Sequence, residues 1–411
     1  MDSDNLRDAL AHRDRIRHME MIIRVFQVDW FAELMDEEFP QLRHLELKGE
    51  APEDLPYIFL GHFLGGSVPS LQHLSIDNIN YEGLPSLLSS TPNLLSLQTK
   101  GIRLDYYMSP EKMVGALYGL TKLRDLCIAF WPNNFGFEFR EVMGLQSPQS
   151  PTHAVLPDLT KLRIRGENEH FENLVNSIDA PRLEDLQVEY LDPDEGEELR
   201  AGNLSRFISR TETFKHAQFG RAAVTLGSHH TLVILGLPRG ECRQARLSHI
   251  VSDQVYHRLV PFVDTVSPVI NWLRQLVIML SDVQYLSIES MVELTLWEDA
   301  SVDWLQLLHT FPAVEVLHVS GEVVKRIASA LNDIPEEMDA QVLPVLQLLW
   351  LDDGQDKKEA TSKSVNRFLA LRKQSGRPVV IIESHDEFIE RLNSHQSELS
   401  PLSGYLASLL P

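Results

Sequence analysis

The sequence contains very little cysteine and no long hydrophobic run. Only Cys127 and Cys242 occur among its 411 residues, far apart and in no paired spacing. This pattern excludes a disulfide framework and a cysteine-based zinc site, and it fits a reducing compartment. A run of about 18 uncharged apolar residues occurs nowhere, and the charged N-terminus lacks the apolar core of a signal peptide. We therefore expect a cytoplasmic or nuclear protein without a membrane segment.

Basic residues are also scarce. The chain has 37 lysine and arginine residues against 59 aspartate and glutamate residues, which gives a formal net charge of −22. Such a charge disfavours sequence-independent binding to phosphate backbones and to anionic membranes. We therefore expect neither nucleic acid nor a membrane as a partner.

The short motifs of common catalytic sites are missing as well. The sequence has no glycine-rich phosphate loop, no H-E-x-x-H zinc motif and no G-x-S-x-G nucleophile turn. His229 and His230 are adjacent, so on a strand they would point apart rather than converge on an ion with Cys242. We expect no catalytic residue, no cofactor and no metal site. An enzyme with a site on inserted loops is left as a remote alternative.

Leucine, in contrast, is abundant. The segment "VPSLQHLSIDN" (68–78) has the pattern L-x-x-L-x-I, and close variants of it recur along the chain at irregular intervals. The gap between Leu186 and Leu286 is much longer than the others and would hold further units. Within that gap, "TFKHAQF" (213–219) and "TLVILGL" (231–237) are candidate strands. The central leucines are Leu45, Leu74, Leu97, Leu126, Leu162, Leu186, Leu286, Leu317 and Leu349.

This pattern predicts an α/β fold. The last two apolar residues of each copy alternate, as they do on a strand with one buried face. Helix-like stretches follow several copies, at 82–90, 109–119, 171–178 and 323–334. One unit cannot bury its own apolar face, whereas stacked units can, so we expect a curved leucine-rich-repeat-like solenoid. Parallel strands would line its concave face, and helices would form its outer face.

The expected domain organisation follows from the same pattern. Residues 1–38 would form an N-terminal helical cap, with a helix over 3–25. Residues 39–384 would form an irregular solenoid, in which 190–280 is either degenerate or an inserted block. The last strand would lie in 377–384. Residues 385–411 would be a C-terminal cap with a tail.

Strand alternation also predicts which side chains a partner would meet on the concave face. Lys161, Arg163 and Arg165 would form a basic row on an acidic protein, unless Asp185 and Glu189 neutralise it. Trp350 would be an exposed aromatic anchor, unless the C-terminal segment covers it. The full set of candidate binding residues is His44, Lys48, His73, Asp77, Lys100, Lys161, Arg163, Arg165, Glu189, Tyr285, His318 and Trp350.

Five segments in this order resemble the F-box domain-containing leucine-rich proteins of mushroom-forming fungi. They are "LAHRDRIRHMEM" (10–21), "FLGGSVPSLQHLSI" (63–76), "WLQLLHTFPAVEVLHVSGEVVKRIASAL" (304–331), "VLPVLQLLWLDD" (342–353) and "FLALRKQSGRPVVI" (368–381). The resemblance covers the repeat region, and we find no F-box.

The resemblance implies a function. In that family, the F-box docks the small adaptor of a cullin–RING ubiquitin ligase, and the repeats hold the protein to be ubiquitinated. We therefore expect a non-catalytic, monomeric protein-recognition module, the substrate-binding part of a ubiquitin-ligase receptor. Its partners would be a protein substrate and, if an F-box is supplied, the ligase adaptor. The alternative is a free-standing leucine-rich scaffold without a ligase.

Overall fold

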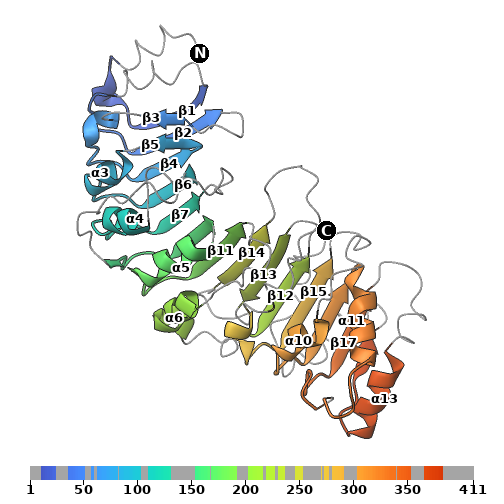
Figure 1. Ribbon diagram of the computed structural model, residues 1–411. Coiled ribbons are helices and arrows are strands. Elements are labelled where there is room, and N and C mark those ends of the chain that lie inside the picture. The colour runs from blue at the N-terminus through green and yellow to red at the C-terminus, as the bar shows by residue number, and fades with distance from the viewer. Residues whose placement is uncertain are drawn as a thin grey trace, which may run out of the picture. The chain divides into compact units, whose positions relative to one another are not determined.

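The computed structural model describes most of the repeat segments of the chain. The described residues are 11–24, 36–50, 57–59, 63–81, 83–102, 110–130, 153–166, 168–191, 202–215, 219–226, 230–236, 246–252, 270, 273–276, 280–290, 303–338, 340–352 and 365–382. The chain divides into two compact units, one formed by 1–191 and 202–215 and the other by 192–201 and 216–411. Both are α/β units built on parallel strands, as Figure 1 shows.

Unit 1 alternates strands and helices along the chain. Its main strands lie side by side in the order β1-β2-β4-β6-β7-β9-β11, and all of these neighbours are parallel. Short strands pair separately, as β3–β5 and β8–β10. The elements are η1 (Arg13–Arg15), β1 (His18–Arg24), β2 (His44–Glu50), β3 (Tyr57–Phe59), η3 (Phe63–Gly66), β4 (His73–Asp77), β5 (Ile79–Tyr81), α3 (Leu84–Ser89), β6 (Ser96–Ile102), α4 (Pro110–Leu117), β7 (Asp125–Phe130), β8 (Ala154–Val155), β9 (Lys161–Gly166), α5 (Asn168–Asn176), β10 (Ile178–Asp179), β11 (Asp185–Leu191), α6 (Gly202–Arg210) and α7 (Glu212–Lys215).

Unit 2 contains a second set of parallel strands and an antiparallel pair. Its strand order is β14-β13-β12-β15-β16-β17-β18. From β12 to β18 the neighbours are parallel, whereas β13 is antiparallel to both β12 and β14. The elements are β12 (Arg221–Leu226), β13 (His230–Gly236), β14 (Arg246–Ser252), β15 (Tyr285–Ser290), α10 (Trp304–His309), β16 (Val316–Ser320), α11 (Val323–Asn332), β17 (Leu348–Asp352), α13 (Asn366–Gln374) and β18 (Val380–Ile382).

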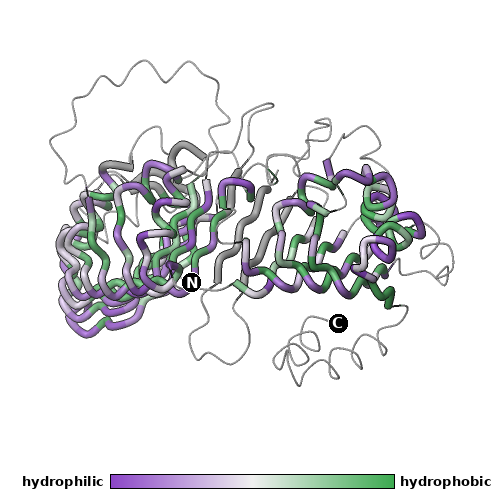
Figure 2. The backbone as a smooth tube through the Cα atoms, turned by 90° about the horizontal axis from the view of Figure 1, so that it is seen from below, coloured by the Kyte–Doolittle hydropathy of each residue, from purple (hydrophilic) through white to green (hydrophobic). Residues whose placement is uncertain are grey.

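The leucine pattern places the core correctly. All nine central leucines lie on main strands, and each pairs in register with the equivalent residue of the neighbouring repeat, for example Leu45 with Leu74 and Leu317 with Leu349. Each of the nine is buried, because alternation directs it to one face of the sheet. Figure 2 shows hydrophobic residues at matching places along successive strands of each unit. The core of each unit is therefore a set of columns running across its strands.

Helices pack against this buried face. In unit 1, α3, α4, α5 and α6 contact one another in sequence and α5 contacts β9, while in unit 2 α11 contacts β15 and β16 (Figure 1). The buried side of α11 is apolar and includes Val324, Ile327 and Leu331, which recur at the three- to four-residue spacing of one helix face. The helices expected at 82–90, 109–119, 171–178 and 323–334 are confirmed as α3, α4, α5 and α11.

Glu172 links two successive helices of unit 1. Its buried carboxylate accepts hydrogen bonds from the backbone N–H groups of Asn203 (2.6 Å) and Leu204 (3.1 Å), in the first turn of α6. These N–H groups have no partner inside their own helix, and the positive end of the helix dipole favours a carboxylate there. A side chain of α5 thus supplies the cap that α6 needs, which fixes the spacing of the two helices.

Three expectations about secondary structure are wrong. The helix expected over 3–25 is not formed at residues 18–24, which form β1 because buried Met19 and Ile23 alternate with exposed neighbours. The strand expected at 213–219 is in part helix α7, whose Phe214 is buried. The strands are also not all parallel, since β13 pairs antiparallel on both sides. The strand expected at 231–237 is confirmed as β13.

Two adjacent isoleucines of β1 test this strand assignment. Ile23 is 1% exposed and Ile22 is 60% exposed, because neighbouring residues of a strand face opposite sides. We expect Ile23→Ala to lower the free energy of unfolding by about 2–4 kcal/mol, since a buried branched side chain is lost. Ile22→Ala should change it by less than about 0.5 kcal/mol. Urea titration followed by circular dichroism measures both. Similar losses for the two variants would contradict the strand.

Candidate functional site

The main strands of unit 1 carry an exposed face opposite the helices. We define the exposed strand face by the three columns of side chains that point away from the leucine columns. Their residues are in register from β1 to β11. The first column is His18, His44, His73, Ser96, Asp125, Lys161 and Asp185; the second is Glu20, Glu46, Ser75, Gln98, Cys127, Arg163 and Gln187; the third is Ile22, Lys48, Asp77, Lys100, Ala129, Arg165 and, by its backbone register, Glu189.

Nine of the twelve predicted binding residues lie in these columns. Lys48, Asp77 and Lys100 are neighbours in the third column, and their charges alternate in sign. His44 and His73 are neighbours in the first column, with ring centroids 5.6 Å apart. The side chain of Glu189 lies outside the described residues. The structure thus brings together the residues predicted on unit 1 along one face.

The basic row lies on β9. Lys161 and Arg163 are exposed, and Arg165 is half-buried. Asp185 on β11 lies directly opposite Lys161, where it could form the ion pair expected from the sequence. Among the described residues, however, neither Lys161 nor Arg163 forms an ion pair, so the neutralisation expected from Asp185 is not observed. Two positive side chains therefore face solvent side by side on an acidic protein.

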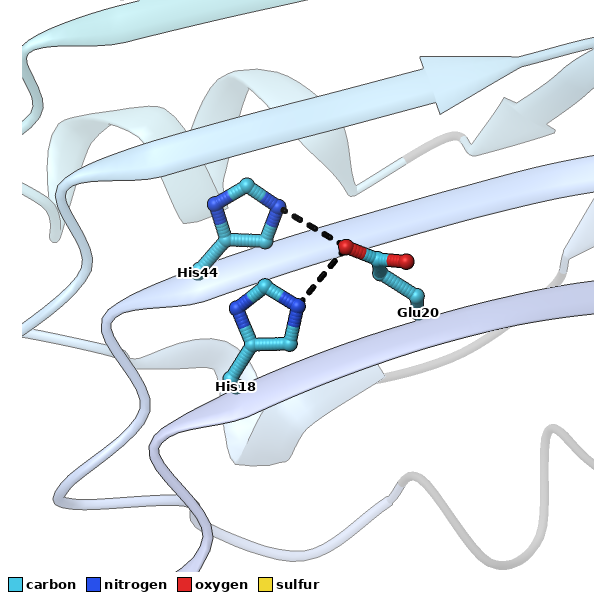
Figure 3. A group of neighbouring side chains, drawn as sticks. All are labelled: His18, Glu20 and His44. Carbon is cyan, nitrogen blue, oxygen red and sulfur yellow. Dashed lines mark hydrogen bonds and ion pairs between the residues drawn. The ribbon is translucent and has the colours of Figure 1, made fainter.

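A cluster of histidine and glutamate lies at the other end of the same face. His18 and Glu20 share the exposed side of β1, and His44 is directly opposite His18 on β2. The imidazole rings of His18 and His44 are stacked, with centroids 4.2 Å apart. Nε2 of His18 is 2.7 Å from Oε1 of Glu20, and Nε2 of His44 is 3.9 Å from the same oxygen. Figure 3 shows both rings directed towards this one carboxylate.

The surroundings of His44 favour its neutral form. Partial burial lowers the pKa of His44 below its ordinary value, and the imidazoles of His18 and His73 lower it further. The carboxylates of Glu20 and Glu46 act in the opposite direction but do not outweigh these effects. A neutral imidazole keeps a nitrogen lone pair available as an acceptor or a metal ligand.

This cluster was not predicted from the sequence. The signal was present as the repeated H-x-E in "HMEM" (18–21) and "HLEL" (44–47), at the same position of two successive repeats. Because β1 was expected to be helical, only the second copy was placed on a strand. Recognition of both copies would have required the register of β1 with β2.

The three predicted binding residues on unit 2 are not exposed. Trp350 is 5% exposed and stacks on His318 of the neighbouring strand, with ring centroids 4.0 Å apart. Tyr285 is also buried, and this burial raises the pKa of its hydroxyl group well above the ordinary value. The expectation that Trp350 is an exposed anchor is therefore wrong. Val316 and Leu348, on the same face of this sheet, are buried as well, so the face is covered here. The C-terminal segment that was expected to cover Trp350 as the alternative, residues 385–411, lies outside the described residues.

Comparison of the chain with protein-family models, with curated proteins and with solved structures found no match. Among the described helices, none has both the length and the apolar character needed to cross a membrane.

Proposed function

We propose that the chain is a leucine-rich-repeat solenoid whose exposed strand face on unit 1 binds another protein, without catalysis. The observation that carries this proposal is the exposed pair Lys161 and Arg163, which lies without an ion pair to another described residue in an otherwise acidic chain. Unpaired surface charges on a rigid sheet favour encounter with a partner of opposite charge.

The character of the whole face supports a protein partner. Positive, negative and uncharged side chains are mixed along the columns, and Lys48, Asp77 and Lys100 alternate in sign. A surface that binds nucleic acid would instead be dominated by basic residues. The rigid register of the main strands also presents these side chains at fixed spacing, which lowers the entropy lost on binding. An acidic segment of a folded partner fits the β9 end of the face best.

The finer proposal is that the partner is the substrate of a ubiquitin ligase. It is supported by the resemblance of five segments to the repeat region of fungal F-box proteins, whose repeats hold the protein to be ubiquitinated. The second candidate, a scaffold without a ligase, is supported by the same exposed face. Association with the ligase adaptor would favour the first candidate over the second.

Reversal of the basic row tests the binding face. We expect Lys161→Glu, Arg163→Glu and Arg165→Glu together to weaken partner binding by roughly 10- to 100-fold, since each exposed charge contributes about 0.5–1 kcal/mol. Partners are first captured on the full chain and identified by quantitative mass spectrometry. The affinity of a purified partner is then measured by isothermal titration calorimetry with wild type and variant.

A matched control separates local charge from net charge. Lys112, Lys122 and Arg206 are exposed and lie outside the three columns, so their reversal to glutamate changes the net charge equally. This control should bind the partner as wild type does. Equal affinity for all three proteins would show that the face is not the site. Capture of the ligase adaptor by wild type and by both variants would support the receptor. Because no F-box is found in this sequence, absence of the adaptor from all three agrees with both candidates.

A further inference from the structure

We infer that His18, Glu20 and His44 form a binding site for a zinc ion on the exposed strand face. The site needs no partner and does not depend on the proposed protein recognition. It lies on β1 and β2, whereas the basic row lies on β9.

The backbone places the three side chains around one point. His18 and Glu20 are two residues apart on β1, so both point to the same face. His44 lies opposite His18 in the parallel register, and neighbouring strands are about 4.8 Å apart. The Cα atoms of the three residues are therefore close neighbours on one face of the sheet. Figure 3 shows them converging above it.

The distances suit a tetrahedral ion. One nitrogen of each histidine and one oxygen of Glu20 all lie within 4.8 Å of one another. Ligand atoms at about 2.0–2.1 Å from a tetrahedral zinc ion are roughly 3.3 Å apart. The separations of 2.7 Å and 3.9 Å from Glu20 Oε1 to the two Nε2 atoms lie on either side of this value. Coordination would therefore require the Glu20–His18 separation to open and the Glu20–His44 separation to close, each by less than about 1 Å.

The environment of the His44 Nε2 atom is a second, independent reason to expect an ion at this site. This nitrogen is buried, although the ring as a whole is about one-third exposed, and it has no hydrogen-bond partner among the described residues. Buried polar atoms in proteins nearly always have a partner, so an unsatisfied nitrogen directed at a carboxylate requires an explanation. An ion between this nitrogen and Glu20 would satisfy both groups.

The donor set favours zinc over the common alkaline-earth ions. Two imidazole nitrogens and one carboxylate oxygen are ligands that zinc accepts, and three protein ligands leave a fourth position for water or another group. Calcium and magnesium prefer oxygen ligands alone. Glu46 lies beside Glu20 and His73 beside His44 on the neighbouring strands, so further negative charge and a further imidazole lie close to the patch.

The test is zinc binding by the full chain. Metal-free protein is titrated with zinc sulfate by calorimetry, and we expect one site with micromolar affinity. His18→Ala combined with His44→Ala should weaken this site at least about tenfold, because two of three ligands are lost. Glu20→Gln, which keeps the side-chain shape, should also weaken it. Calcium and magnesium should not bind there.

His309→Ala is the matched control, since His309 is an exposed histidine on α10 outside the cluster. It should leave zinc affinity unchanged. Titration with cobalt adds a spectroscopic measurement, because the visible absorption of bound cobalt reports its coordination geometry. This absorption should be lost in the double variant and kept in His309→Ala. Circular dichroism verifies that the double variant is folded. Equal zinc affinity of wild type and a folded double variant, or no binding by wild type, would overturn the inference.

Discussion

Trp350→Ala should lower the free energy of unfolding by about 3–5 kcal/mol, the usual cost of removing a large buried aromatic side chain. Trp350 is 5% exposed, and its ring stacks on His318 at 4.0 Å with an interplanar angle of 21°. Because neighbours on β16 and β17 are buried on the same sheet, the cavity would have little room to collapse. Urea titration followed by far-ultraviolet circular dichroism is the suitable measurement, since tryptophan fluorescence changes with the substitution itself.

Trp350→Phe keeps an aromatic ring in the stack and should cost only about 1–2 kcal/mol, because most of the volume remains. The pair of variants also separates two roles for this residue. A surface anchor would lose partner affinity on truncation and keep its stability. Unchanged stability of the alanine variant would therefore contradict the buried position.

Gly321→Ala should destabilise the protein by about 2–4 kcal/mol, for two reasons that add. Gly321 has a φ of +76°, a left-handed conformation that side-chain-bearing residues rarely adopt. A Cβ atom there would also lie 2.4 Å from the backbone oxygen of Ser290, at the end of β15. The N–H group of Gly321 donates to the carbonyl of Asp352, 3.0 Å away at the end of β17. Because β16 lies between β15 and β17, a shift of Gly321 away from Ser290 would press its N–H group against the Asp352 carbonyl.

Gly376→Ala is the control that separates the steric clash at Gly321 from the cost of its backbone conformation. Gly376 has nearly the same φ of +75°, but a Cβ atom would have no neighbour within 4 Å. We expect a loss of only about 1 kcal/mol from the backbone conformation. Chemical denaturation of both variants gives the difference directly. Equal losses of unfolding free energy in the two variants would mean that the structure accommodates the new Cβ atom beside Ser290 without an energetic cost.

Much of the strand arrangement could be predicted because one rule decides it. A leucine that alternates with polar residues must face the core, and the nine central leucines obey this in both units. The rule fails for β1, where "HMEMIIR" contains no leucine and methionine and isoleucine supply the buried face instead. The rule also does not predict that β13 is antiparallel, because side chains alternate every two residues whichever way a strand runs.

The candidate site was less predictable because alternation assigns a face, not its exposure. On β9 the face opposite the leucines is open, so Lys161 and Arg163 meet solvent as expected. On β17 the same position is covered, and Trp350 belongs to the interior. The histidine cluster was missed for another reason. His18 and His44 belong to different repeats, and only the pairing of β1 with β2 makes them neighbours.

The antiparallel strands β13 and β14 of unit 2 have a consequence for the cost of loop closure. Leu45 pairs with Leu74 of the next repeat, whereas Ala222 pairs with Leu286 only after the chain has passed through β13 and β14. The second connection is roughly twice as long as the first, and each doubling of a flexible connection costs only about 0.6 kcal/mol in chain entropy. The longer excursion is therefore inexpensive, provided that the two strands still meet in register. Selection on such a chain would act on the side chains that set the register. The lengths of the connections between strands could then vary during evolution, which makes the repeats hard to recognise by their spacing.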